Sequence, residues 1–91
     1  MLLEIVSPEA TLFSGEVTSV TLPGVMGEFE LLNNHAPVIS LLKEGNVKIN
    51  GNITLEEEVE KLFNKSDKGF WLPISSGTLE MKDNKVIVLA D

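Results

Sequence analysis

The sequence predicts a mainly β protein with an antiparallel sandwich or barrel architecture. Short segments with apolar residues at every second position recur along the chain, and turn-forming residues separate them at intervals of about 8 to 12 residues. β-Branched residues dominate the last of these segments, residues 86–90. Only residues 55–64 have the periodicity of a helix. Because no repeat or linker interrupts the chain, we expect one domain over residues 1–91.

The amino-terminal strands follow from apolar alternation and its breaks. Residues 3–5 alternate, and Pro8, which has no N–H to donate, comes shortly after this first strand. Residues 11–17 resume the extended pattern, with Gly15 as the predicted bulge or bend. The inward-facing pattern continues over residues 20–22. We therefore expect a second and a third strand here, joined as one bent ribbon.

The middle of the chain, residues 22–42, contains the strongest turn signals. Pro23 and Gly24 are predicted to stop the preceding strand and reverse the chain. A short strand over residues 28–32 then ends at the turn-forming pair at 33–34. Residues 38–42 are almost continuously apolar, which predicts a strand that is buried on both faces.

The next segments predict one more strand and then a helix. Residues 47–49 alternate as a half-exposed strand, and an Asn-Gly-Asn turn follows at 50–52. Thr54 and Glu57 have the spacing of a capping box, which predicts a helix of about 10 residues. One apolar stripe of the helix is formed by Leu55, Val59, Leu62 and Phe63.

The carboxy-terminal third returns to β alternation. In residues 70–74, Trp71 is predicted to face away from the core and to be covered by the helix stripe. Residues 78–82 and 86–90 form the last two strands, with Leu79 and Met81 pointing inward in the first of them. The pair at 83–84 is the predicted hairpin tip between these strands.

Composition excludes several functional classes. The net charge is −7 and arginine is absent, which disfavours contact with a phosphate backbone, so we expect no nucleic acid partner. Cysteine is absent, which removes disulfides and thiolate metal sites. No apolar run reaches the roughly 18 residues of a membrane-spanning helix, so we expect no direct membrane insertion.

The sequence also lacks a recognisable catalytic or cofactor-binding pattern. His35 is the only histidine, and a structural or interface hydrogen bond suits it better than catalysis. Neither a dinucleotide fingerprint nor a P-loop occurs. The glutamates at 56–58 and 60 are interpreted as a solvated helix face. We therefore expect no catalytic residue, cofactor or metal, and a protein-binding role instead.

Ordered short motifs over nearly the whole chain resemble the amino-terminal domain of the ATP synthase epsilon subunit. Each motif is weak alone, but their order and spacing together are specific. They are Leu12-Phe13-Ser14-Gly15-Glu16-Val17, Val20, Leu22-Pro23-Gly24, Gly27-Glu28-Phe29, His35-Ala36-Pro37, Leu42-Lys43-Glu44-Gly45, Val47, Ile49, Ser75, Gly77, Leu79-Glu80-Met81 and residues 86–91.

This resemblance implies a β-sandwich of two roughly five-stranded sheets and a rotor function. Such a domain sits in the central stalk and fastens the gamma subunit to the membrane c-ring, so that proton or sodium flow drives ATP synthesis. It implies a non-catalytic subunit, peripheral to the cytoplasmic face of a bacterial inner membrane. The family's helical, inhibitory carboxy-terminal domain has no counterpart in the sequence, so we expect coupling without inhibition.

The resemblance also assigns contact residues. Glu28, with Val25 and Met26, would face the polar loops of the c-ring. His35, Ser40 and Ser7 would lie towards the gamma subunit. The chain departs from the family pattern at Glu30, where glycine is usual, and in residues 51–68, which are longer than the usual hairpin.

Two other functions remain open at this point. One is a free-standing β-sandwich adaptor that pairs a peptide with an exposed edge strand. The other, an acidic hydrolase, has little support because no two carboxylates are placed on rigid neighbouring strands.

Overall fold

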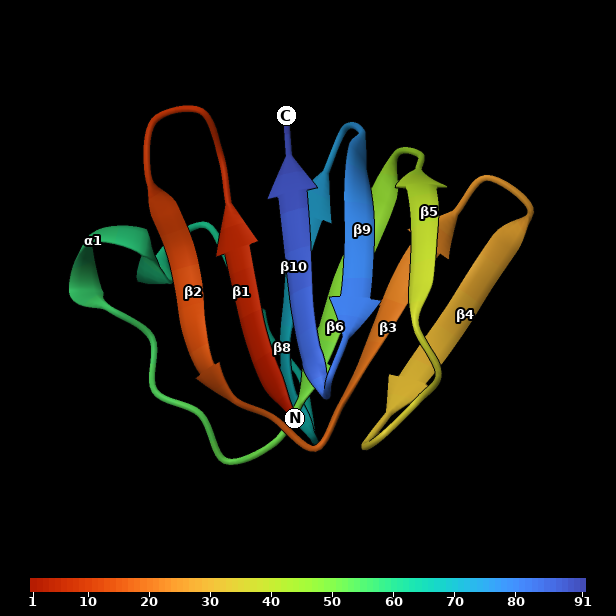
Figure 1. The fold of residues 1–91 in the computed structure, drawn as a ribbon. Helices are drawn as coiled ribbons and strands as arrows, with labels where there is room; N and C mark the ends of the chain where they lie inside the picture. The colour runs from red at the N-terminus through yellow and green to blue at the C-terminus, as the bar shows by residue number, and fades with distance from the viewer.

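Ten strands and one short helix make up the computed structural model, which describes residues 1–91 (Figure 1). The strands are β1 (Leu2–Val6), β2 (Thr11–Glu16), β3 (Ser19–Gly24), β4 (Gly27–Leu32), β5 (Val38–Leu42), β6 (Gly45–Asn50), β7 (Asn64–Lys65), β8 (Gly69–Ile74), β9 (Gly77–Lys82) and β10 (Lys85–Ala90), and the helix α1 is Glu57–Glu60.

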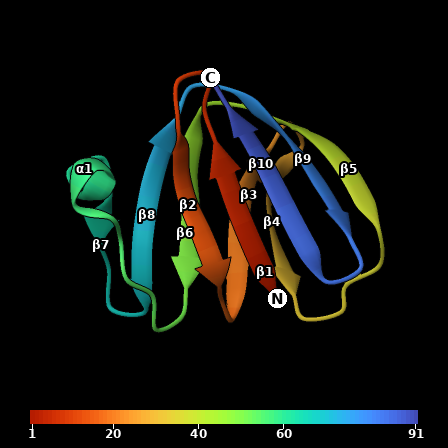
Figure 2. The same ribbon diagram turned by 60° about the vertical axis from the view of Figure 1, so that its left-hand side comes forward.

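The strands curl into two facing layers of five (Figures 1 and 2). One layer has the order β2-β1-β10-β9-β5, and the other consists of β3, β4, β6, β8 and β7. The layers join where Gly24 of β3 pairs with Leu42 of β5, and the N–H of Lys43 donates to the carbonyl of Pro23 at 2.8 Å. The predicted sandwich of two five-stranded sheets is confirmed.

One strand pair departs from the predicted antiparallel arrangement. β1 and β10 run parallel, with Leu2 opposite Lys85 and Val6 opposite Leu89, whereas every other pair is antiparallel. A hairpin forces its two strands to be antiparallel, but β1 and β10 come from opposite ends of the chain. No turn therefore sets their direction, and local sequence signals could not reveal it.

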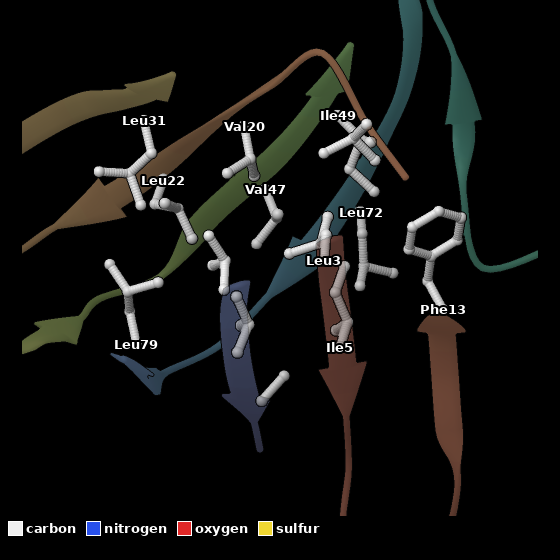
Figure 3. Close-up of a cluster of buried hydrophobic side chains, with 14 of the residues drawn as sticks. Leu3, Ile5, Phe13, Val20, Leu22, Leu31, Val47, Ile49, Leu72 and Leu79 are labelled. Atoms are coloured by element: carbon white, nitrogen blue, oxygen red, sulfur yellow. The ribbon is translucent and has the colours of Figure 1, made fainter. Parts of the chain in front are cut away.

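The core is a single cluster of buried apolar side chains between the layers. Figure 3 shows side chains from both layers directed toward one another, including Leu3 of β1, Leu22 of β3 and Leu79 of β9. The inward positions predicted for Val20, Leu22, Leu79 and Met81 are confirmed, since each side chain is at most 1% exposed. Full burial of such a side chain contributes about 1.5–3 kcal/mol to folding.

Strand β5 is not buried on both faces, and this prediction is wrong. Ile39 is 78% exposed and Leu41 is 63% exposed, whereas Leu42 is buried. Alternate residues of β5 face the core and the solvent, as in any strand of a two-layer fold. Its apolar run is continuous because the outward face is apolar as well.

Pro23 and Gly24 do not end their strand, which is a second correction. β3 continues to Gly24, and the two-residue turn consists of Val25 and Met26. Gly24 and Gly27 flank this turn as a pair, so Pro23 and Glu28 form the next, non-hydrogen-bonded pair of the hairpin. Proline therefore removes no hydrogen bond from the β3–β4 ladder.

The irregularity predicted at Gly15 occurs elsewhere. Gly15 pairs in register with Leu3, and the register shifts near Val6, which pairs with Thr11. A Cβ atom at position 15 would lie 3.2 Å from Cζ of Phe13. Glycine at this position therefore leaves room for the buried phenylalanine ring.

The helix is much shorter than predicted. Only Glu57–Glu60 are helical; the N-cap residue is Glu56 instead of Thr54, and no side chain caps the helix. Leu55 and Phe63 are buried, but Leu62 of the predicted stripe is 44% exposed. So short a helix has little stability of its own, and the chain turns away to form β7 against β8.

Residues 51–68 nevertheless cover the open side of the sandwich, where the edge strands β2 and β7 lie (Figures 1 and 2). The ring of Phe63 meets that of Phe70 edge to face, with centroids 6.4 Å apart. Phe70 shares the inward face of β8, so Phe63 packs on that face. The end of the same segment reaches the opposite face, where Ser66, Asp67 and Lys68 line an open hollow with Lys48 and Trp71. Trp71 does face outward as predicted, but it lies beside Lys48 and is not covered by the helix.

Phe63 provides a test of how this segment is anchored. We expect Phe63→Ala to lower the free energy of unfolding by about 3 kcal/mol, because it removes a buried ring and leaves a cavity. The neighbouring exposed Leu62→Ala should change it by less than about 0.5 kcal/mol. Urea denaturation of both variants measures this difference. Equal effects would contradict the anchoring role of Phe63.

Candidate interaction surfaces

The turn between β3 and β4 displays two apolar side chains to solvent. Val25 is 53% exposed and Met26 is 97% exposed. Gly27, which follows them, has φ of +124°, a conformation that side-chain-bearing residues rarely adopt. Together with Glu28, these residues form what we call the hairpin surface: Val25, Met26 and Glu28. The structure therefore brings together all three residues that the resemblance assigns to the c-ring.

Glu28 takes part in an ion pair on the outer face of its sheet. The Lys48 ammonium lies 3.0 Å from Oε2 and 3.3 Å from Oε1 of Glu28. The same ammonium lies 4.6 Å from the centroid of the Trp71 ring. Lys48 is opposite Thr21 of β3 on one side and Trp71 of β8 on the other. The carboxylate is thus fixed directly beside the hairpin turn.

A second apolar surface covers the outside of the other sheet. Leu41, Thr78, Leu89 and Val6 are successive partners across β5, β9, β10 and β1. Leu41 and Leu89 are 63% and 53% exposed. Ile39, Glu80 and Ile87 form the adjacent row, which ends at Glu4 of β1, outside the apolar area. We call these two rows the outer-sheet patch; its residues are Val6, Ile39, Leu41, Thr78, Glu80, Ile87 and Leu89.

The two surfaces adjoin each other. An open groove is lined by Val25 of the hairpin turn and by Leu41, Thr78 and Leu89 of the outer-sheet patch. This contact follows from the junction of the layers, where Gly24 pairs with Leu42. Gly24 directly precedes the turn that contains Val25, and Leu42 directly follows Leu41, so the pairing places the turn beside Leu41. Exposed apolar side chains of the hairpin tip and of the sheet face therefore line one groove, together with the polar Ser76 and Asp91, as in protein interaction sites.

The three residues assigned to the gamma subunit do not form one cluster. Ser7 follows Val6 at one end of the outer-sheet patch, and Ser40 precedes Leu41 at its other end. Ser40 itself is half-buried, and its Oγ donates to the carbonyl of Leu41 at 3.1 Å. The loops that contain Ser7 and His35 lie at opposite ends of the sandwich (Figure 1).

His35 belongs to the exposed loop between β4 and β5. Its Nδ1 lies 2.8 Å from the carbonyl oxygen of Ala36, and its backbone N–H donates to the carbonyl of Leu32. The preceding residue, Asn34, donates its N–H to Oδ1 of Asn84 at 2.7 Å, which fastens the loop to the β9–β10 turn. The imidazole therefore belongs to neither surface, whereas Pro37 of the same loop lines a hollow with Ile39 and Glu80 of the outer-sheet patch.

The sequence interpretation missed the residues that dominate these surfaces. Ile39 and Leu41 belong to the run that is predicted to be buried on both faces, Leu89 is predicted only as part of the last strand, and Lys48 has no predicted role. The available signal was apolar side chains at both odd and even positions of residues 38–42 and 86–90. Such a run suits a strand buried on both faces or a strand with an apolar outer face, and periodicity alone does not separate the two.

No group of three or more metal-ligating side chains lies close together in the structure. No helix of the structure has the length and apolar character that crossing a bilayer requires.

Comparison with known proteins identifies the family. All of residues 1–91 match the family described as ATP synthase, delta/epsilon chain, β-sandwich domain. The chain is 38% identical over 89 residues to the ATP synthase epsilon chain of Chlorobium limicola, covering 98% of this chain and 86% of that one. It is 39% identical over 89 residues to the epsilon chain of Campylobacter concisus, of which it spans 59%.

A solved structure has the same fold. The chain superimposes with a TM-score of 0.74 on a chain from the cryo-EM structure of the Tetrahymena thermophila mitochondrial ATP synthase central stalk and c-ring. The match covers 98% of this chain and 61% of that chain at 14% sequence identity, so it supports the fold alone. From the family match and the curated relatives, we conclude that this chain belongs to the ATP synthase delta/epsilon β-sandwich family and is of the epsilon type.

Proposed function

We propose that this protein is a rotor subunit of the central stalk of a bacterial-type ATP synthase. In this role it fastens the gamma subunit to the c-ring and helps to couple ion flow to ATP synthesis, without catalysing a reaction itself. The main structural support is the open groove that joins Val25 to Leu41 and Leu89, which Ser76, Thr78 and Asp91 also line. A subunit that links two partners needs two contact surfaces on a rigid body, and the hairpin surface and the outer-sheet patch are the candidates.

The hairpin surface is the proposed contact with the c-ring. Met26 and Val25 extend from the turn, and the Glu28 carboxylate lies beside them as a hydrogen-bond acceptor. Exposed apolar tips flanked by a charged group suit the polar loops that connect membrane helices. In this arrangement the protein is peripheral, at the cytoplasmic face of the inner membrane, and reaches the membrane sector through its partner.

The outer-sheet patch is the proposed contact with the gamma subunit. Its apolar side chains are exposed in the isolated chain and would be buried by a partner. Ser7 follows Val6 at one end of its central row and would form part of the polar rim of that interface. Ser40 lies on the core-facing side of β5, opposite the buried Leu79, so a partner on the patch would reach it only at the edge of β5. His35 would contact the same partner only at the margin of the footprint, since its loop lies at the far end of the sandwich.

The adaptor function remains the second candidate because of one observation. β4 pairs only with β3, so the backbone groups on its other edge are free to pair with a peptide strand. Capture experiments with the complete chain separate the candidates, since the rotor function requires recovery of the gamma subunit and the adaptor function requires an unrelated extended peptide.

Charge reversal at Glu28 tests the proposed ring contact. We expect Glu28→Lys to reduce the amount of c-ring that co-purifies with the assembled complex about tenfold, because the new cation repels Lys48 and removes the acceptor. Glu30→Lys is the matched control, since Glu30 is exposed on the same strand and has no ion pair. Undiminished ring recovery with Glu28→Lys would exclude the proposed contact.

Leu41 tests the proposed gamma contact. We expect Leu41→Asp to weaken binding to the gamma subunit by at least about fivefold, because an aspartate would be buried without a partner in the interface. Leu62→Asp places the same charge at an exposed leucine outside the patch and should bind normally. Binding is measured by titration of the folded variants with the gamma subunit. Equal affinities for the two variants would argue against this use of the patch.

A further inference from the structure

Three side chains from three strands form a connected row on the outer face of one sheet. Glu28 comes from β4, Lys48 from β6 and Trp71 from β8, and β3 runs between the first two. The Lys48 ammonium contacts both oxygens of Glu28 and also lies over the indole ring. Lys48 is therefore held from both sides, by a carboxylate and by an aromatic face.

Each contact restricts a different degree of freedom. The ion pair orients the Glu28 carboxylate, which would otherwise rotate freely because 51% of this side chain is exposed. The indole face attracts the cation and keeps the long lysine side chain against the sheet. Trp71 is 38% exposed, so this face of the indole is available to Lys48. Without Trp71, the ammonium would move among many rotamers, and the carboxylate would follow it.

We propose that Lys48 is a positioning residue for the hairpin surface, with Trp71 as its support. This inference rests on the proposed ring contact of Glu28. An ionised carboxylate has about four acceptor sites, so Glu28 can accept from Lys48 and from a donor on the partner at the same time. Lys48 thus orients the carboxylate beside the turn before the partner arrives, which lowers the entropy lost on binding.

Glu30 gives a matched internal comparison. It occupies the same strand two residues further on, faces the same side of the sheet and is exposed. None of the ion pairs in the structure includes Glu30. A general effect of removing a charge from β4 would therefore appear equally at both glutamates, whereas the proposed row makes only Glu28 sensitive.

The first measurement uses the emission of Trp71, the only tryptophan of the chain. We expect Glu28→Gln to shift this emission, because the released ammonium moves relative to the ring. Glu30→Gln should leave it unchanged. Salt at about 1 M, where the screening length is about 3 Å, should reduce the difference between the wild type and Glu28→Gln. An identical emission in wild type and Glu28→Gln would overturn the proposed row.

The second measurement uses complete synthase complexes assembled with each variant. We expect Lys48→Met to weaken ring attachment by about two- to fivefold, in the range of exposed ion pairs, and Lys48→Arg to restore it. In the double variant Glu28→Gln/Lys48→Met, attachment should be no weaker than in Glu28→Gln alone, because Lys48 acts through Glu28. Circular dichroism of each isolated variant verifies folding.

The outcomes distinguish the two proposals. Normal attachment in Glu28→Gln would exclude the ring contact itself. If Glu28→Gln weakens attachment but folded Lys48→Met attaches normally, the ring contact of Glu28 is retained. Only the positioning role of Lys48 is then overturned. An additive loss in the double variant would also overturn it, because Lys48 would then act independently of Glu28.

Discussion

The junction of the two layers at Gly24 and Leu42 determines where the candidate surfaces lie. A Cβ atom at position 24 would approach the Phe29 ring to 2.7 Å and the Gly27 carbonyl to 2.9 Å. Likewise, a Cβ atom at position 45 would lie 2.6 Å from Cβ of Pro23. The Phe29 ring and the Gly27 carbonyl therefore favour glycine at position 24, and the Pro23 side chain favours it at position 45. Because β3 and β5 meet here, the turn that follows β3 is held next to the outward face of β5.

Charge and apolar exposure are separated on this molecule. The chain has a net charge of −7, and the helical segment alone contains Glu57, Glu58 and Glu60. The rows of the outer-sheet patch contain Glu80 among mostly aliphatic side chains, and the row through Ile87 continues to Glu4 of β1, which forms an ion pair with Lys85. A net charge of this size favours solubility and disfavours non-specific association, while the patch keeps a surface that a specific partner can desolvate. The fold therefore exposes apolar side chains on one part of the surface, while the negative charge elsewhere disfavours non-specific association.

Local sequence signals predicted the strands well. They did not predict features that depend on contacts between residues far apart in the chain. The turn at Asp83 and Asn84 was predicted correctly because both residues adopt positive φ, which asparagine and aspartate tolerate. The parallel pairing of β1 with β10 has no local signature. The helix was overextended because Leu55 and Phe63 are buried by tertiary contacts that the helical periodicity does not describe. The tip of the hairpin surface follows from the turn residues, whereas Lys48 and Trp71 become neighbours only through strand register.

The position of residues 51–68 explains how this chain accommodates an extended connection between β6 and β8. The segment leaves β6 at Asn50, at the end of the strand opposite to the Lys43 and Glu44 turn, and returns to β8 at Gly69. A Cβ atom at Gly69 would lie 1.9 Å from the carbonyl oxygen of Ile49, so the returning strand starts directly against β6. The buried residues of this segment fill the open side of the sandwich between the edge strands β2 and β7. The β3–β5 junction lies in the middle of the strand order, several strands away from this side. Length can therefore change in this connection while the hairpin surface and the outer-sheet patch keep their relative positions.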